Sequence, residues 1–370
     1  MIDKILNKIE KTLLYLEQKC GIYFSSITIA LFLICIAAIY VTPAFAPMQL
    51  GRGYASLSIR PFDFSEQNDL RFRILTPLLA HIVGLRGSLY IVFPTIIAII
   101  LLATIYYYLR KNQQPTESLF ITMLICFSTP ILFLLHFQGY VDVTSYLLIL
   151  LIIIFIKKPF IWIFLMILLL FNHDSNLFIL PSLFYLYYIQ RNDKRLLIIS
   201  LALLIIFIPF YLYRTWVSSL SPVGYDMEMY SSQIVENVKT IAPCFFIGLF
   251  YSFKLFWLFP LIAIYVSWNK KNRHQLILFS LLFFGVLLQL LFASDTSRLI
   301  GLAFPLIIFS SVKVLQFWGR DLFLKRTFVL ILINFLVPQY YVGQSTMIKF
   351  YSLPSSYILK HYFGIETWIG

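Results

Sequence analysis

The chain has 370 residues, of which 60% are hydrophobic and only 12% are charged. A soluble protein of this length has no interior large enough for so much apolar side-chain surface, so the composition indicates an integral membrane protein. Its 29 Lys and Arg residues outnumber its 16 Asp and Glu residues, but the cations lie in short clusters between long apolar runs, which argues against nucleic acid as a partner.

The N-terminal segment, residues 1–20, is predicted to be an amphipathic helix that lies on the membrane surface. Four lysines alternate there with apolar residues at helical spacing: Lys4, Lys8, Lys11 and Lys19. The first long apolar run follows at about residues 24–42. It is too long for the apolar region of a signal peptide, and no convincing cleavage site follows it. We therefore expect this run to be the first membrane span.

Apolar runs suited to crossing a bilayer recur along the rest of the chain. They lie at 88–109, 118–136, 140–156, 159–172, 175–190, 196–213, 243–267, 275–293, 299–317 and 327–343. Together with the first run they make about eleven spans, with a range of about 10 to 13, because short runs can be tilted or broken. The sequence thus predicts an all-α, polytopic transmembrane helical bundle that forms a single membrane domain over residues 1–370.

The distribution of charge predicts the orientation of the bundle. Lysine and arginine cluster in alternate connections, which places the N-terminus in the cytoplasm. Two connections on the other side are long enough to have structure of their own, 43–87 and 214–242, and the apolar stretch 74–85 within the first fits a re-entrant amphipathic helix. Most acidic residues also fall on that side, so any chemistry is expected to face outward from a bacterial cytoplasmic membrane.

The first long connection has the densest charge pattern. Asp63, Glu66 and Asp69 are spaced three apart and would lie along one face of a helix, and Arg71 and Arg73 follow them. Carboxylates at this spacing could supply a base, contact substrate or hold Mg²⁺ or Mn²⁺. The arginines could bind phosphate. The alternative is a solvated loop in which acids and bases only pair with each other.

Two short polar turns interrupt apolar runs on the same side. Asp142 follows the polar stretch HFQGY, where it could contact substrate or only cap the next helix. In the tetrad NHDS, His173 and Asp174 could bind phosphate, relay a proton or ligate a metal, or they could form an Asx-type turn. We take Asp142 and Asp174 as candidate substrate-binding residues and His173 as a candidate for binding phosphate.

Two further charged sites border or interrupt apolar runs. Arg298 directly precedes one run, with Asp295 three residues before it. Its planar guanidinium suits a phosphate or pyrophosphate oxygen, although snorkelling to the membrane surface is the alternative. Lys254 lies within another apolar run, where a cation needs a partner or water. Asp295 and Lys254 are therefore also candidate substrate-binding residues.

An outward carboxylate, several arginines and a membrane-embedded cavity suit sugar transfer from a lipid phosphate. The phosphate leaving group needs neutralisation by Arg or Lys but no general acid. One carboxylate can then act as base on an acceptor hydroxyl, whereas glycoside hydrolysis usually requires a matched pair of carboxyls. The sequence has no P-loop and no GxGxxG opening a helix after a strand, so no nucleotide site is expected.

The chain resembles the GT-C superfamily of integral membrane glycosyltransferases in its layout. The likeness consists of an inside N-terminus, a first span followed by a long outer loop bearing acids, the amphipathic re-entry DLRFRILTPLLA and about eleven spans. The resemblance implies that the catalytic base lies in the first outer loop, which makes Asp69, or failing that Asp63, the candidate. It places Arg71, Arg73 and Arg298 on the donor phosphate.

The expected activity is transfer of a sugar from a polyprenyl-phosphate-linked donor to a glycan, lipid or protein acceptor on the extracytoplasmic side. Membrane lipids are the other expected partners, and Mg²⁺ or Mn²⁺ could serve as a cofactor. The alternatives are a lipid-linked glycan polymerase or ligase, and a transporter or flippase for a lipid-linked anionic substrate. Charges near the bilayer midplane and an internal repeat would favour a transporter. The charges lie mainly at span ends, with Lys254 as the main exception, so the sequence favours an enzyme.

Overall fold

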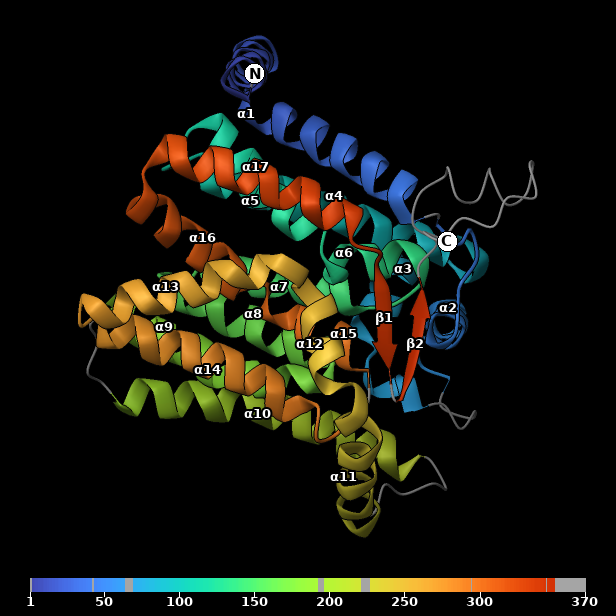
Figure 1. The fold of residues 1–370 in the computed structure, drawn as a ribbon. Coiled ribbons are helices and arrows are strands. Elements are labelled where there is room, and N and C mark those ends of the chain that lie inside the picture. The colour runs from blue at the N-terminus through green and yellow to red at the C-terminus, as the bar shows by residue number, and fades with distance from the viewer. Residues whose placement is uncertain are drawn as a thin grey trace.

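The protein is almost entirely helical in the computed structural model (Figure 1). The structure describes residues 2–41, 43–63, 69–191, 196–220, 227–293, 295–343 and 345–349. The helices of the first half are α1 (Ile2–Val41), α2 (Leu50–Ile59), η1 (Asp69–Phe72), α3 (Leu75–Ile82), η2 (Gly87–Ile91), α4 (Val92–Leu109), α5 (Pro115–Cys126), α6 (Thr129–His136), α7 (Asp142–Ile154), α8 (Pro159–Asn172), η3 (Asp174–Ile179) and α9 (Leu180–Arg191). The second half contains α10 (Leu196–Ser219), α11 (Met227–Ile241), η4 (Ala242–Cys244), α12 (Phe245–Phe253), η5 (Lys254–Trp257), α13 (Leu258–Asn269), α14 (Arg273–Gln289), α15 (Thr296–Leu299), η6 (Ile300–Ala303), α16 (Phe304–Trp318), α17 (Arg320–Leu336), β1 (Tyr340–Gly343) and β2 (Thr346–Lys349).

An all-α membrane bundle is confirmed, whereas the expected count of eleven spans is not. Among the described residues, 5 helical stretches are long and apolar enough to cross a membrane: Ile2–Val41, Gly87–Leu109, Ala202–Ser219, Ile234–Asn269 and Thr296–Trp318. A sixth is obtained if α5 and α6, which bend by 52° at their junction, form one broken span. Three shorter apolar helices, α7, α8 and α14, pack among them.

Local sequence explains where several helices begin and turn. Gln114 and Glu117 form a capping box at the start of α5, and Pro115 occupies its first turn, where its missing N–H costs nothing. Gly21 has a positive φ of 77° and breaks α1 into two helical halves. Gly319, with φ 76°, separates α16 from α17. Glycine adopts this left-handed backbone without the steric cost that a side chain would add.

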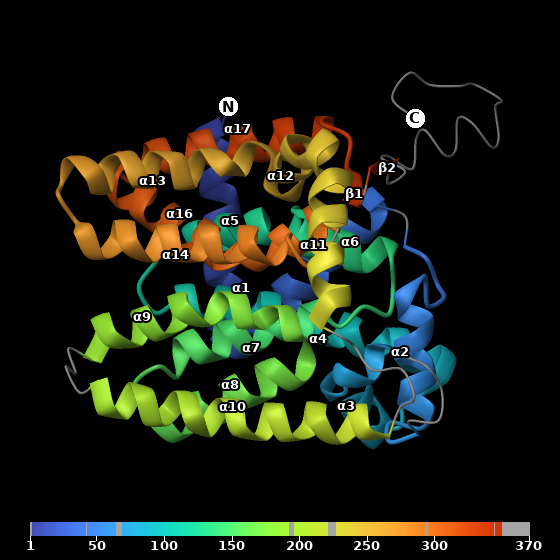
Figure 2. The same ribbon diagram turned by 90° about the horizontal axis from the view of Figure 1, so that it is seen from below.

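The apolar helices run side by side, and the short elements gather at one end of the bundle. α4 packs between α1 and α7, and α7 packs in turn on α8. On the other side of the bundle α13 packs on α16, which contacts α17. Figures 1 and 2 place α2, α3 and the two strands together at the right-hand end, and α11 projects below the bundle in Figure 1. The turn between α13 and α14 lies at the opposite end.

The last apolar run, expected as a span over 327–343, differs from the prediction. α17 ends at Leu336, and Tyr340–Gly343 form β1, which pairs antiparallel with β2. Pro338 cannot continue the helical hydrogen-bond ladder. The Tyr-Tyr-Val sequence after it has a high strand propensity. Apolar character alone could not distinguish this short strand from the end of a helix.

The described parts of the two long connections contain regular helices. In 43–87 the described residues form α2, η1 and α3, and α3 falls within the helix expected at 74–85. In 214–242 the helix α10 continues to Ser219, and α11 begins at Met227. The described part of both connections is therefore mainly helical.

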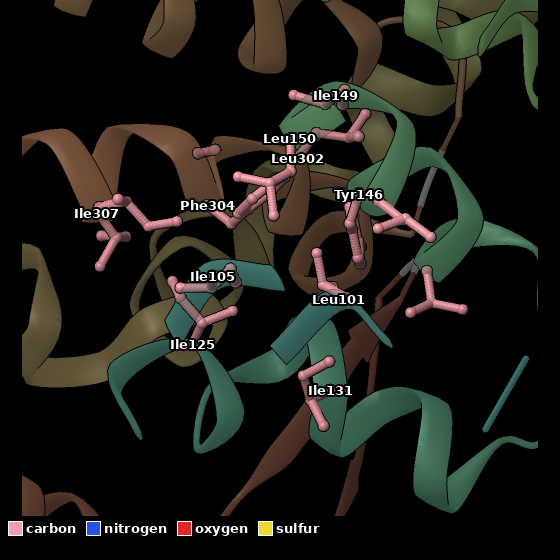
Figure 3. Close-up of a cluster of buried hydrophobic side chains, with 14 of the residues drawn as sticks. Leu101, Ile105, Ile125, Ile131, Tyr146, Ile149, Leu150, Leu302, Phe304 and Ile307 are labelled. Carbon is pink, nitrogen blue, oxygen red and sulfur yellow. The ribbon is translucent and has the colours of Figure 1, made fainter. Parts of the chain in front are cut away.

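A buried apolar cluster fixes the helices next to the polar end of the bundle (Figure 3). Side chains from α4, α5, α6, α7, η6 and α16 meet there: Leu101, Ile105, Ile125, Ile131, Tyr146, Ile149, Leu150, Leu302, Phe304 and Ile307. Tyr146 is fully buried, and a Cβ atom added at Gly301 would lie 2.6 Å from its hydroxyl. Only glycine therefore allows η6, and α15 before it, to approach α7 this closely.

Candidate anion-binding site at one end of the bundle

Asp174 is the centre of one half of a polar cluster. Its carboxylate lies 3.3 Å from the guanidinium of Arg73 on one oxygen and 3.3 Å from that of Arg214 on the other. His173 Nδ1 lies 3.2 Å from the same carboxylate and 2.7 Å from the hydroxyl of Ser175. These side chains come from the loop after η1, from α10 and from the junction of α8 with η3. One acid is thus flanked by two arginines that are far apart in sequence.

Arg298 is the centre of the other half. It is buried at 4% exposure and lies 2.8 Å from a carboxylate oxygen of Asp295 and 4.0 Å from one of Asp142. Its guanidinium carbon also lies 4.9 Å from the ring centroid of Tyr140, a favourable cation–π arrangement. The hydroxyl of Tyr341, on β1, donates a hydrogen bond to Asp295. The hairpin therefore closes over this half of the cluster.

Asn172 joins the two halves. Its side-chain amide donates to the carbonyl of Val141 at 3.0 Å and to the hydroxyl of Ser145 at 2.8 Å. These bonds tie the end of α8, which leads into His173, to the start of α7 at Asp142. Asn172 is completely buried, so its bonds are shielded from water and hold the two turns at a fixed distance.

Tyr54 of α2 gives a second connection between the halves. Arg73 donates a hydrogen bond of 3.2 Å to its hydroxyl. Burial raises the pKa of Tyr54, and the charges of Arg73, Asp142 and Arg298 also act on it. Tyr54 is therefore close enough to both halves to feel their charges. The polar groups of the two turns thus form one electrostatic unit.

Several buried polar atoms of this cluster have no hydrogen-bond partner among the described residues. They are Arg71 Nε and Nη1, Asp142 Oδ2, His173 Nε2 and Arg298 Nε. An unsatisfied buried donor or acceptor costs about 1–3 kcal/mol, and more when it is charged. Such atoms gathered at one end of the bundle fit a site that binds a polar ligand.

The local charges set the protonation of the groups outside the membrane-spanning helices. Burial opposes ionisation of Asp174, but Arg73, His173 and Arg214 outweigh it and hold the pKa of that carboxyl well below its usual range. Burial, reinforced by the charge of Arg73, lowers the pKa of His173. Burial raises the pKa of Tyr140 to about 12. Near neutral pH the site therefore contains an ionised Asp174 and a neutral imidazole.

The cluster is suited to binding an anion. Four arginines belong to it or adjoin it, against three aspartates: Arg71, Arg73, Arg214 and Arg298 with Asp142, Asp174 and Asp295. Guanidinium forks bind phosphate oxygens through paired N–H donors. A phosphate bound beside the arginines would accept charge-assisted hydrogen bonds from their N–H groups, including Nε of Arg298 and Nε and Nη1 of Arg71, which have no hydrogen-bond partner among the described residues.

The structure brings together many of the residues singled out in the sequence. Arg73, His173, Asp174, Asp142, Asp295 and Arg298 all lie in the cluster. Arg71 is buried at 2% exposure beside Phe72, and its carbonyl accepts a hydrogen bond of 2.7 Å from the hydroxyl of Tyr213. The two remote polar turns and the first long connection therefore meet.

The three acids of the first long connection are described only in part. Asp63 is exposed, and its carboxylate lies 3.7 Å from Arg60. Glu66 and the side chain of Asp69 lie outside the described residues. Among the residues that the structure describes, no group of three His, Cys, Asp or Glu side chains could hold a metal ion. The proposed Mg²⁺ or Mn²⁺ ligands include the two undescribed side chains.

Lys254 has a different role from the substrate contact suggested by its place in an apolar run. It is buried at the break between α12 and α13, where its φ is 48°. Its ammonium donates to the carbonyls of Val337 at 2.7 Å and Asn334 at 3.2 Å, and to the hydroxyl of Tyr40 at 3.3 Å. These three bonds use all of its donors. Lys254 thus caps the end of α17 and anchors the chain that leads to β1.

Four residues of the cluster were not predicted from the sequence: Tyr54, Tyr140, Arg214 and Tyr341. Arg214 follows an apolar run directly, as Arg298 precedes one, so the same signal could have found it. Nothing in the local sequence around the tyrosines distinguishes them from the many aromatic residues of the membrane boundary.

No protein-family model matches the sequence, and no curated protein is significantly similar to it.

Proposed function

We propose that the chain is a membrane glycosyltransferase that takes a sugar from a polyprenyl-phosphate-linked donor. The observation that carries the proposal is the cluster in which arginines from distant segments surround partly buried aspartates at one end of an apolar bundle. A lipid-linked donor suits this place because its phosphate would reach the arginines while its chain stays among apolar helices. The activity would belong to a GT-C-like, roughly eleven-span arrangement, and the apolar helical bundle of the described residues is compatible with it.

In this proposal the arginines hold the phosphate. Arg73 and Arg214 flank one edge of the site, and Arg298 flanks another. His173, with its unbonded Nε2, adds a neutral hydrogen-bonding group. The positive charges stabilise the phosphate as negative charge develops on it, so the leaving group needs no proton. Arg71 provides a further buried guanidinium next to the site.

Asp142 is the described carboxylate best suited to act as base. Asp174 is held ionised by two arginines and has a depressed pKa, which makes it a poor proton acceptor. Asp295 is already bonded to Arg298 and Tyr341. One oxygen of Asp142 has no hydrogen bond. Asp69 stays a candidate, because its side chain lies outside the described residues.

The reaction is a direct displacement at the anomeric carbon. The acceptor hydroxyl gives its proton to the carboxylate as its oxygen bonds to that carbon. The bond between the anomeric carbon and the phosphate oxygen breaks with its electron pair, and polyprenyl phosphate leaves among the arginines. Positioning of both substrates supplies much of the rate. We place this chemistry on the extracytoplasmic side, following the charge distribution of the loops.

The test is transfer by the purified protein in proteoliposomes, using a panel of labelled polyprenyl-phosphate sugars with and without chelator. Asp142→Asn should lower the transfer rate about 10²–10⁴-fold while the protein stays folded, and Asp69→Asn tests the other candidate base. Full transfer by both variants would reject a carboxylate base from these positions. A chain-length distribution of products would instead indicate a polymerase, and uptake without transfer would indicate a transporter.

A further inference from the structure

The N-terminal half of α1, residues 2–20, separates its acids from its lysines. Its three acids recur every seven residues and so lie on one side of the helix; they are Asp3, Glu10 and Glu17. The lysines lie on the opposite side at i, i+4, i+7 and i+15; they are Lys4, Lys8, Lys11 and Lys19. Such complete separation along five turns gives the helix two faces with different charge.

The acidic face docks on the protein itself. Near the N-terminus, Asp3 lies 2.9 Å from Lys325 of α17. About two helical turns later, Glu10 pairs with Arg320 of α17. Arg320 also lies 3.2 Å from Glu117 of α5. Each acid of this part of the helix is thus matched by a cation on the bundle.

The third acid completes the docking. Both oxygens of Glu17 accept hydrogen bonds from Arg110 at the end of α4, at 2.8 and 2.9 Å, and Tyr106 donates a further bond of 2.7 Å. Leu6 and Leu13 are buried on the same side of the helix. All three acids of this face are therefore paired with cations of the bundle.

The lysine face has no such partner. All four lysines are exposed, and none forms an ion pair with an acid in the described parts of the chain. Tyr15 lies on the same face with 62% exposure, and the ammonium of Lys19 lies 5.8 Å from its ring centroid. The face therefore combines a row of cations with an exposed aromatic ring, a combination found at membrane interfaces.

The position of this face defines its partner. At Gly21 the helix turns into its apolar half, whose exposed side chains include Phe24, Leu31 and Phe32. The N-terminal half is seen end-on in Figure 1, so it runs across the direction of the apolar helices. It lies beside the C-terminal end of α4 and the N-terminal ends of α5 and α17. These ends carry its partners Arg110 and Arg320, and Glu117, which pairs with Arg320. A helix that crosses the direction of the apolar helices at their ends matches the arrangement of a helix lying among lipid headgroups.

We propose that the face formed by Lys4, Lys8, Lys11, Tyr15 and Lys19 binds the headgroups of anionic phospholipids. Positive charge on one face and an apolar half that continues into the bilayer both match an anionic lipid surface. The acidic face acts as an internal clamp that orients the lysines toward the lipid. The proposal does not depend on the enzymatic activity.

Hydrogen–deuterium exchange of the full-length protein in lipid nanodiscs tests this directly. We expect the backbone amides of residues 2–20 to exchange about tenfold more slowly in phosphatidylcholine mixed with phosphatidylglycerol than in phosphatidylcholine alone. The reason is that each surface lysine gains attraction to anionic lipid. High salt should remove the difference. The variant with Lys4, Lys8, Lys11 and Lys19 all replaced by Gln should lose it and still fold, because these side chains are exposed.

A matched variant controls for the loss of four charges. It replaces Lys157, Lys158, Lys270 and Lys271, in connections between other helices, by Gln. We expect this control to keep the lipid-dependent protection of residues 2–20. Equal exchange in the two lipids for the natural protein, or an equal loss of protection in both variants, would overturn the proposal. The first of these outcomes would leave an acidic protein as the partner of the lysine face.

Discussion

Replacing Asp142 and Asp295 in turn by Asn separates catalysis from stability in the cluster. Both aspartates face Arg298, but their contacts differ. Asp295 lies 2.8 Å from the guanidinium and also accepts a hydrogen bond from Tyr341. Asp142 lies 4.0 Å away, and one of its oxygens has no hydrogen bond. The two substitutions therefore remove the same charge from different contact geometries.

The expected magnitudes follow from these contacts. A hydrogen bond to a charged group contributes about 1.5–3 kcal/mol, and breaking a buried ion pair costs about 3–5 kcal/mol. Asp295→Asn should therefore lower the free energy of unfolding by about 3 kcal/mol. At 4.0 Å the attraction of Asp142 for Arg298 is about 4 kcal/mol at an effective dielectric constant of about 20, and desolvation of the carboxylate offsets most of it. Asp142→Asn should cost about 1 kcal/mol or less.

Two assays measure the contrast. Tryptophan fluorescence during denaturant unfolding in detergent gives the stability of each variant, and transfer in proteoliposomes gives its activity. We expect Asp142→Asn to lose about 10²–10⁴-fold in transfer rate while staying nearly as stable as the natural protein. The reasoning would be refuted if Asp142→Asn were as destabilising as Asp295→Asn, or if it transferred sugar at the natural rate.

Three further predictions concern other parts of the structure. Gly51→Ala should destabilise the fold by about 1–3 kcal/mol in thermal unfolding, because the added Cβ would lie 2.4 Å from the backbone oxygen of Gln138. An unchanged midpoint temperature of unfolding would contradict this packing. Lys254→Met should cost about 2 kcal/mol or more by removing three hydrogen bonds to buried groups, yet binding of polyprenyl phosphate should be unchanged, and a selective loss of binding would restore Lys254 as a ligand contact. The pKa of Asp174 is depressed in the folded state, so its contribution to stability should be complete above about pH 4 and should disappear as the pH falls through that lower pKa. The difference in stability between the natural protein and Asp174→Asn should therefore shrink in acid. A difference that stays constant with pH would be inconsistent with this linkage.

The sequence contains enough information to predict the class of fold and most of the charged residues of the site. Long apolar runs identify membrane helices because the bilayer demands about 20 such residues. Charged residues at the ends of these runs are costly, and Arg73, His173, Asp174 and Arg298 stood out for that reason and do lie together. Their position at helix ends on the same side of the bundle was the useful signal.

Other features depend on packing that the sequence does not display. Among the described residues, fewer helices qualify as spans than predicted, because several apolar runs form the shorter helices α7, α8 and α14 or the bent pair α5 and α6. The hairpin that brings Tyr341 to Asp295 follows from Pro338 and from pairing between β1 and β2, which no periodic pattern indicated. Long-range contacts of single tyrosines have no local signature.

The central claim is that Arg73 and Arg298, from opposite halves of the cluster, bind one phosphate. A double-mutant cycle measures this directly through the affinity of the purified protein for polyprenyl monophosphate, with polyprenol as the uncharged control and Lys270→Gln as the variant control. We predict that Arg73→Gln and Arg298→Gln each weaken binding of the phosphate about tenfold or more without changing that of polyprenol, and that the double variant loses less affinity than the product of the two single effects. Unchanged affinity in the single variants, or two effects that multiply independently, would contradict a shared phosphate site.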